Sequence, residues 1–220
     1  MSFTPSTTSA AAARAPAAQL VAQPAAQPAL RERVLQASRE LLAEGGPAAL
    51  SMREVARRSG VTHQAPYHHF PDKASIVAEL VTQGFEELAG RLSLAHGPAV
   101  PGGREARRAT LRAAAEAYLG FALDHPAVFR LMFRPELCES ARFPQAREAA
   151  ERARGELHRL VCTVHGSAAD ESLASLHWAH VHGLACLSLD GPLEHCMPAE
   201  AERRAHLRAA TEHFVRMVLP

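Results

Sequence analysis

The chain has 220 residues, of which 47% are hydrophobic, and its formal net charge at pH 7 is +1. This size allows one large domain or two small ones with a sizeable core. The balanced charge excludes a polycation that coats nucleic acid by bulk charge, so a nucleic-acid contact has to rest on a local cluster. No apolar run approaches the roughly 20 residues that span a bilayer, so we expect no membrane contact. The four cysteines show no CxxC spacing, which indicates reduced thiols in a cytoplasmic protein.

Residues 1–29 form an arm rich in alanine, proline, glutamine and threonine. The arm lacks the charged start and continuous apolar core of a secretory signal, and it cannot bury enough surface to fold, so we expect it to be disordered. From Leu30 the chain is rich in alanine, leucine, arginine and glutamate, without alternating runs of valine, isoleucine and threonine. This composition favours an all-α fold of about nine helices.

Two helices are expected directly after the arm. The first begins at Leu30 and ends at the glycines and proline of "EGGP", residues 44–47. The second begins at Ser51 and lasts two turns, because Ser51 and Glu54 have the S-x-x-E spacing of a capping box.

A tight turn and two more helices follow. Gly60 ends the second helix, and Thr62 is a good N-cap for a third helix over about residues 63–69. Asp72 then caps a long fourth helix that should run to about residue 94.

Two helices joined by a tight glycine-containing turn form a helix-turn-helix, whose second helix enters the major groove of DNA. The N-terminal end of that helix reaches base edges, and here it carries His63, Gln64 and Ala65. The surrounding basic side chains, opposed by only two carboxylates, are suited to phosphate contacts; they are Arg53, Arg57, Arg58, His68, His69 and Lys73. The local sequence therefore predicts binding to double-stranded DNA, whereas an exposed, solvated helix face is the alternative.

Residues 31–80 resemble the N-terminal DNA-binding domain of the TetR family of bacterial transcriptional regulators. The resemblance rests on spaced motifs: "EGG" after the first helix, "VA" followed by "SGVT", and "YHHF" followed by a lysine. It implies that Tyr67, His69 and Lys73 contact phosphates and that Phe70 anchors the core. It also implies that His63, Gln64 and His68 read bases or face the groove. The predicted DNA-binding set is Ser51, Arg53, Thr62, His63, Gln64, Ala65, Tyr67, His68, His69 and Lys73.

One dipeptide, Ala65-Pro66, departs from the family pattern, in which a small residue and an aliphatic one are usual. Pro66 would fall near the end of the first turn of the third helix, where few intrahelical hydrogen bonds are lost. The departure therefore bears on base specificity and not on the fold.

Residues 76–220 are expected to form a larger helical body behind the DNA-binding domain of residues 30–75. The loop "AHGPAVPGG", residues 95–103, precedes four or five further helices, of which one runs from about residue 144 to 165. The helix over about residues 170–189 is apolar on two sides and must be covered on two sides. With the last helix it can supply half of an intermolecular four-helix bundle, and the candidate dimer residues are Val181, Ala185, Leu189, Leu207, Phe214 and Met217.

Within this body, "WAHVHG", residues 178–183, resembles a Trp/His/Gly motif of the regulatory domain in some TetR-like proteins. Because bodies of this family generally bind small ligands and dimerise through their last two helices, the resemblance implies a small-molecule effector and a homodimer. The candidate ligand-binding residues are Tyr118, Phe121, Phe129, Met132, Phe133, His177, Trp178 and His180. Ordinary core packing is the alternative for Phe121, Phe129, Met132 and Trp178.

The sequence thus predicts a ligand-responsive regulator, a repressor that binds a palindromic operator as a homodimer and is released by a small molecule. No enzyme activity, cofactor or metal is expected. The alternative is a helical metal-binding protein or metalloenzyme, in which His177 and His180, one turn apart, join Cys186 or Cys196. No carboxylate completes an HExxH motif, and hydrogen-bonded histidines in a pocket or dimer seam explain the same spacing.

Overall fold

The computed structural model describes residues 1, 29–97, 102–138, 141–166 and 169–220, so nearly all of the predicted N-terminal arm lies outside the described residues. The described part is all-helical and contains nine α-helices and one 3₁₀ helix, η1, with no strand. These elements are α1 (Leu30–Ala49), α2 (Met52–Arg58), η1 (Ala65–His68), α3 (Lys73–His96), α4 (Gly103–Asp124), α5 (Pro126–Met132), α6 (Pro144–His165), α7 (Glu171–Leu189), α8 (Pro192–Cys196) and α9 (Glu200–Val218). The all-α prediction is confirmed. None of the described helices is long and apolar enough to cross a membrane.

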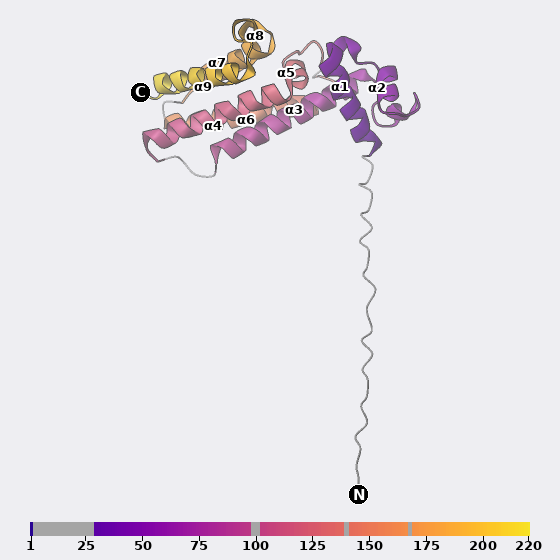
Figure 1. Ribbon diagram of the computed structural model, residues 1–220, viewed down its shortest axis with the longest axis horizontal. Helices are drawn as coiled ribbons and strands as arrows, with labels where there is room; N and C mark the ends of the chain where they lie inside the picture. Colours follow the sequence, from indigo (N-terminus) through magenta and orange to yellow (C-terminus); the bar gives the residue numbers. More distant parts are fainter. Residues whose placement is uncertain (2–28, 98–101, 139–140, 167–168) are drawn as a thin grey trace.

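The helices divide into a small head and an elongated body (Figure 1). Helices α1 and α2 and the segment that follows them form the head at one end, and α3 runs from the head along the body beside α4 and α6. Helices α7 and α9 pack on α4, and the C-terminus lies at the end of the body far from the head. Because α3 belongs to both parts, it is the main mechanical link between them.

Helix boundaries in the head follow the capping residues. Gly46, at a positive φ of 64°, breaks α1 before Pro47, so the helix is interrupted at the predicted "EGGP" stretch. The Asp72 carboxylate accepts a hydrogen bond from the Ser75 N–H, and the Ser75 hydroxyl returns the contact by accepting the Asp72 N–H, which completes a capping box at the start of α3.

Helix α5 wedges between head and body, because it packs on both α1 and α3. The close approach to α3 depends on Gly84: a Cβ there would lie 2.6 Å from Met132 Sδ and 2.9 Å from Val128 Cγ1. Any larger residue would force these helices apart.

The core of the body includes an apolar stripe along one side of α4. All six members of that stripe are buried, namely Leu111, Ala114, Ala115, Tyr118, Phe121 and Ala122. Helix α6 has the predicted bounds and lays buried alanines and valines along α3. The two long helices therefore form one wall of the body.

Candidate functional site

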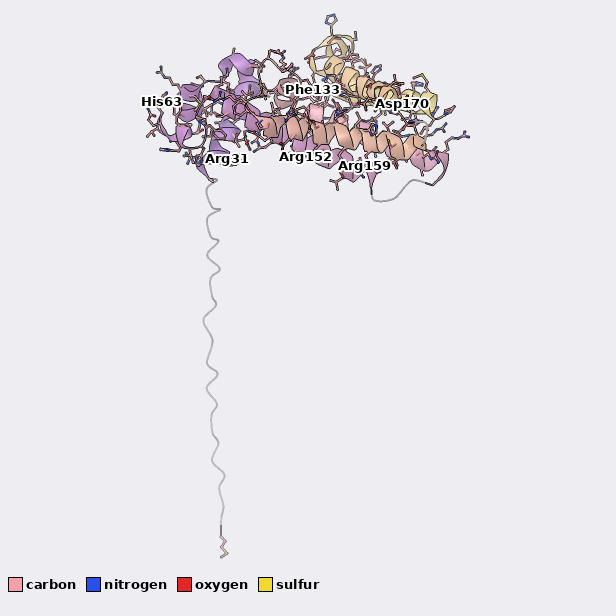
Figure 2. All side chains as sticks on the ribbon, turned by 180° about the vertical axis from the view of Figure 1, so that it is seen from behind. Arg31, His63, Phe133, Arg152, Arg159 and Asp170 are labelled. Carbon is pink, nitrogen blue, oxygen red and sulfur yellow. The ribbon has the colours of Figure 1, made fainter. Side chains whose placement is uncertain are left out.

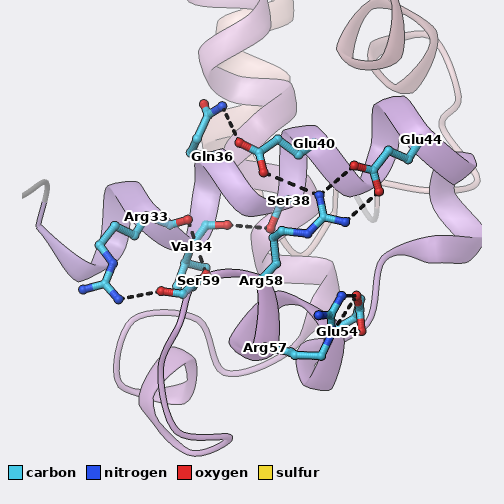
Figure 3. Close-up of polar contacts among 10 residues, drawn as sticks. All are labelled: Arg33, Val34, Gln36, Ser38, Glu40, Glu44, Glu54, Arg57, Arg58 and Ser59. Atoms are coloured by element: carbon cyan, nitrogen blue, oxygen red, sulfur yellow. Dashed lines mark hydrogen bonds and ion pairs between the residues drawn. The ribbon is translucent and has the colours of Figure 1, made fainter.

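The side chains around α2 hold the head in one arrangement (Figure 3). The Ser51 hydroxyl accepts a hydrogen bond from the Glu54 N–H at 3.2 Å, which caps α2 as predicted. The second hydrogen bond of a capping box, from the Ser51 N–H to the Glu54 carboxylate, is not found among the described residues. The Glu54 carboxylate instead accepts hydrogen bonds from Arg57 Nε at 3.0 and 3.1 Å. Arg33 donates to the Ser59 carbonyl at 2.5 Å and so ties the C-terminal end of α2 to α1.

Two of the arginines expected to face phosphates are engaged within the head. Arg58 donates to both oxygens of Glu44 at 2.7 and 2.6 Å, and its hydrogen bonds hold the pKa of that carboxyl below its usual range. Arg57 is paired with Glu54. Arg53 is exposed, and no ion pair involves it among the described residues. The free positive charge on this face is therefore smaller than the sequence indicates.

The helix predicted over about residues 63–69 is shorter than expected and is not an α-helix. Residues Ala65–His68 form a short 3₁₀ helix instead, and the preceding residues form a turn. The hydrogen bonds join residues three apart: Ala65 N–H donates to the Thr62 carbonyl at 3.0 Å, and His69 N–H donates to the Pro66 carbonyl at 3.0 Å. Pro66 lacks the N–H that an α-helix starting at residue 63 would bond to Thr62, so the tighter winding is favoured. Thr62 contributes its carbonyl and not the predicted side-chain cap.

This segment, residues 62–69, presents its polar side chains outward. Thr62, His63, Gln64, His68 and His69 are exposed. His63 lies at the outer end of the head (Figure 2). We call residues 62–69 the recognition segment.

Two apolar side chains support the recognition segment from below. Pro66 is buried, and Phe70 is 4% exposed, in agreement with its predicted role as a core anchor. Ala65 is half-buried, and Tyr67 is 40% exposed, with its ring 5.8 Å from that of His63. The recognition segment is thus a rigid, solvent-facing platform.

Lys73 follows at the first turn of α3. Its Nζ donates to the Pro47 carbonyl at 2.7 Å, which joins α3 to the end of α1. An ammonium has three donors, so this bond leaves capacity for a phosphate beside the recognition segment.

Comparisons with known proteins agree with this geometry. Residues 34–80 match the model of bacterial regulatory proteins of the tetR family, and residues 111–213 match that of the tetracyclin repressor-like C-terminal domain. The chain belongs to the TetR family. The family consists of regulatory proteins and not of enzymes.

Individual relatives of this TetR-family chain match the head or the whole fold. A stretch of 48 residues is 44% identical to the HTH-type transcriptional repressor Rv3405c of Mycobacterium tuberculosis, a match that spans 22% of this chain and 26% of that protein. A solved protein of unknown function from Rhodococcus sp. RHA1 is 28% identical, with a TM-score of 0.72 over 90% of this chain and 100% of that one. The TetR family transcriptional regulator PfmR of Thermus thermophilus, at 18% identity, has a TM-score of 0.60 over 85% of this chain and 97% of its own, and shows the fold alone.

The body of this TetR-family protein contains a cavity of about 270 Å³ between α3, α4, α6 and α7. Three of the predicted ligand residues, Tyr118, Phe133 and Trp178, line it. Phe121 and Phe129 are at most 2% exposed and do not line it. Phe121 and Phe129 are therefore better described as core residues than as residues of this cavity.

The other predicted ligand residues lie at separate hollows. Met132 faces a second hollow, with Phe133 between the two, and His177 and His180 line a void of only about 30 Å³. The eight candidates therefore do not converge on one site.

A hydrogen-bonded chain beside the cavity of about 270 Å³ includes His182, which sequence reasoning missed. Trp178 Nε1 donates to the Tyr118 hydroxyl at 3.3 Å, and that hydroxyl lies 2.9 Å from His182 Nδ1. His182 Nε2 is 3.5 Å from Cys186 Sγ. Burial raises the pKa of Tyr118 and lowers the pKa of His182. The spacing of residues 178, 182 and 186, one helical turn apart, was the available signal.

The histidines of the metal alternative do not meet the proposed cysteines. His177 Nε2 lies 3.0 Å from His165 Nε2, and the His180 ring stacks on Phe214 with centroids 4.0 Å apart. Cys186 contacts His182, and Cys196 is exposed. Within the described ranges no three histidine, cysteine or carboxylate side chains gather as a metal site.

The predicted dimer residues need correction. Val181, Ala185, Leu207 and Phe214 are at most 9% exposed and pack inside the protomer, so they are not available to a partner. Leu189 is half-buried, and Met217 is 69% exposed. The large apolar side chains that α7 leaves exposed are Leu176, Leu187 and Trp178, at 48%, 45% and 39%. These exposures fit a helix that is apolar on two sides, but Val181 and Ala185, two of the predicted dimer residues, pack inside the protomer.

Proposed function

We propose that this protein is a ligand-responsive one-component transcriptional regulator in the cytoplasm, a repressor that binds a palindromic operator as a homodimer. The observation that carries the proposal is the recognition segment: five exposed polar residues on a buried Pro66–Phe70 support, at the outer end of the head. A mycobacterial relative that matches 48 residues of this chain is named a transcriptional repressor, which supports repression over activation.

Contacts to bases and contacts to the backbone should come from different residues. Gln64 is suited to base edges, because a glutamine amide pairs bidentately with adenine in the major groove. Arg53 and Lys73 are suited to phosphates, which position the protein without reading sequence.

The two-fold symmetry of a homodimer would match a palindromic operator. The exposed Leu176, Leu187 and Met217 on α7 and α9 are an apolar surface suited to a second copy. Two heads would then have to meet major grooves about 34–36 Å apart.

Two links support control of the head by the body. Phe133, which lines the cavity, directly follows α5, and α5 packs on α1 of the head. Arg142, from the loop before α6, donates to Asp72 Oδ2 at 2.5 Å, immediately after the recognition segment. A ligand that shifts α5 or α6 would therefore change the spacing of the heads, and DNA affinity would fall by the ligand's differential binding to the two states.

The test measures binding to duplex fragments from the region upstream of the protein's own coding sequence, over a range of salt concentrations. Arg53→Ala should weaken binding to all sequences and reduce the salt slope by about one unit. Gln64→Ala should mainly lower discrimination between sequences, by roughly 1–3 kcal/mol at one base step.

The matched control is Arg107→Ala, an equally exposed arginine in the first turns of α4, at the body end far from the head, which should leave both properties unchanged. Equal effects of Arg53→Ala and Arg107→Ala, or no salt-dependent binding to any fragment, would contradict the proposal.

A further inference from the structure

The cavity of the body has an apolar interior and a small volume. Its volume of about 270 Å³ is slightly below the usual range for ligand sites, roughly 300–1,000 Å³. The interior wall consists of aliphatic and aromatic side chains from four helices and the residue after α5; its larger members are Phe85, Leu88, Leu92, Phe133, Leu157 and Trp178. Such a wall suits the apolar part of a small molecule.

The polar groups of this wall are already satisfied. Trp178 Nε1 donates to the Tyr118 hydroxyl, and that hydroxyl is bonded to His182. A ligand donor or acceptor buried deep in the cavity would find few partners, at a cost of roughly 1–3 kcal/mol for each unpaired group. The buried part of the ligand should therefore be a hydrocarbon or an unsubstituted ring.

The charged residues of the cavity all come from one face of α6. Arg147, Glu151 and Arg154 are spaced four and three residues apart, so they share a side of the helix. Both arginine side chains are exposed, at 60% and 64%, and their carboxylate contacts are limited to 3.6 Å from Arg147 to Glu151 and 3.0 Å from Arg154 to Glu171. Two cations and one anion line the cavity, and Glu171 pairs with the second cation, so a ligand carboxylate would take the place of these partners at the arginines.

We propose that this cavity binds a small apolar molecule that ends in a single anionic group, a carboxylate in the simplest case. The apolar part lies between Phe133 and Trp178, and the anion binds Arg147 and Arg154, whose guanidinium groups match a carboxylate bidentately. An anion at Arg154 competes with Glu171, and therefore weakens a contact between α6 and α7. This inference rests on the proposed function, since it names the chemical class of the effector.

The experiment uses Trp178, the single tryptophan of the chain, as a fluorescent reporter in the cavity. The full-length protein is titrated with straight-chain carboxylates from butanoate to dodecanoate, and with octan-1-ol and octylamine as neutral and cationic counterparts of octanoate. The fluorescence should change with at least one acid of intermediate length, and the acid should bind at least tenfold more tightly than the alcohol of the same length. The amine should bind most weakly.

Variants then locate the anion. Arg147→Gln combined with Arg154→Gln should weaken the acid at least tenfold and leave the alcohol unchanged. Arg152→Gln is the matched control, because Arg152 lies on the same helix, is similarly exposed and pairs with Glu86 outside the cavity (Figure 2). Ala153→Phe, which fills the cavity from a buried lining position, should abolish the response. Circular dichroism and thermal unfolding confirm that each variant is folded.

Several outcomes would overturn the assignment: no acid of the series binds below millimolar concentration, the alcohol or the amine binds as tightly as the acid, or the double arginine variant behaves like Arg152→Gln. Binding that survives in folded Ala153→Phe would place the ligand elsewhere and also refute it. The fluorescence assay contains no DNA, so an acid that binds to a protein without salt-dependent DNA binding would refute the regulator and leave this site standing.

Discussion

Asp72 joins the head to the body, and its replacement separates two stabilising roles. Oδ1 accepts the Ser75 N–H at 2.8 Å and caps α3, whereas Oδ2 accepts Arg142 at 2.5 Å. The hydrogen bond from Arg142, and then that from Ser75, hold the pKa of Asp72 below its usual range. The cap and the ion pair both lie shortly after the recognition segment in the chain.

The expected magnitudes differ between the two roles. Loss of an N-cap costs about 1 kcal/mol of unfolding free energy. The ion pair contributes only about 0.5 kcal/mol, because both side chains are partly exposed, at 45% for Arg142 and 40% for Asp72. Asp72→Ala should therefore cost about 1.5 kcal/mol, and Asp72→Asn, which keeps a capping oxygen, should cost about 0.5 kcal/mol. Arg142→Gln should cost at least as much as Asp72→Asn, because it also removes the contact of the guanidinium with the Phe143 ring.

Urea unfolding of the three single variants and of the double variant Asp72→Asn with Arg142→Gln measures these terms. The double variant should cost little more than either single variant, because both remove the same pair. DNA binding should weaken in Asp72→Ala and stay near the wild-type value in Arg142→Gln. Equal destabilisation by Asp72→Ala and Asp72→Asn would refute the division between cap and ion pair.

Two further predictions concern the body. Burial lowers the pKa of His177 from 6.5 to about 4, so the folded state favours its neutral form. Stability from this group is complete above pH 6.5 and is lost as the pH falls towards 4, by about 2 kcal/mol at pH 5; urea unfolding at pH 7.5 and 5 should show this loss, and His177→Gln should reduce it. Gly84→Ala should destabilise the fold by about 1 kcal/mol, because overpacking against Met132 exceeds the gain in helix propensity. Gly90→Ala, in the same helix with no atom within 4 Å of the added Cβ, should stabilise it by about 0.5–1 kcal/mol, and equal signs for the two variants would contradict this account.

Local signals predicted the frame of the molecule well. The Ser51 and Asp72 caps lie where their spacing placed them, and α6 begins and ends at the predicted residues. Each of these features depends on residues within one turn of each other, so a single sequence contains the whole interaction.

Features that depend on distant partners were predicted less well. Nothing near Arg58 in the sequence indicates that Glu44, on α1, binds it. Periodicity located both apolar faces of α7, but a helical pattern does not say which face meets the protomer and which remains outside. The cavity residues Arg147 and Arg154 were missed for the same reason, because their significance comes from Tyr118 and Trp178 on other helices.

Pro66, the residue that departs from the family pattern, accounts for the shape of the recognition segment. As a buried residue without an N–H, it winds residues 65–68 into a 3₁₀ turn and accepts the N–H groups of His69 and Phe70 through its carbonyl, at 3.0 and 2.9 Å. A 3₁₀ helix of four residues is only about 8 Å long, and residues three apart lie on the same side. Gln64 and Tyr67 therefore share one side, and Ala65 and His68 share another. A segment this short can present only two or three side chains to the major groove, so most of the affinity for DNA has to come from phosphate contacts and from the pairing of two heads.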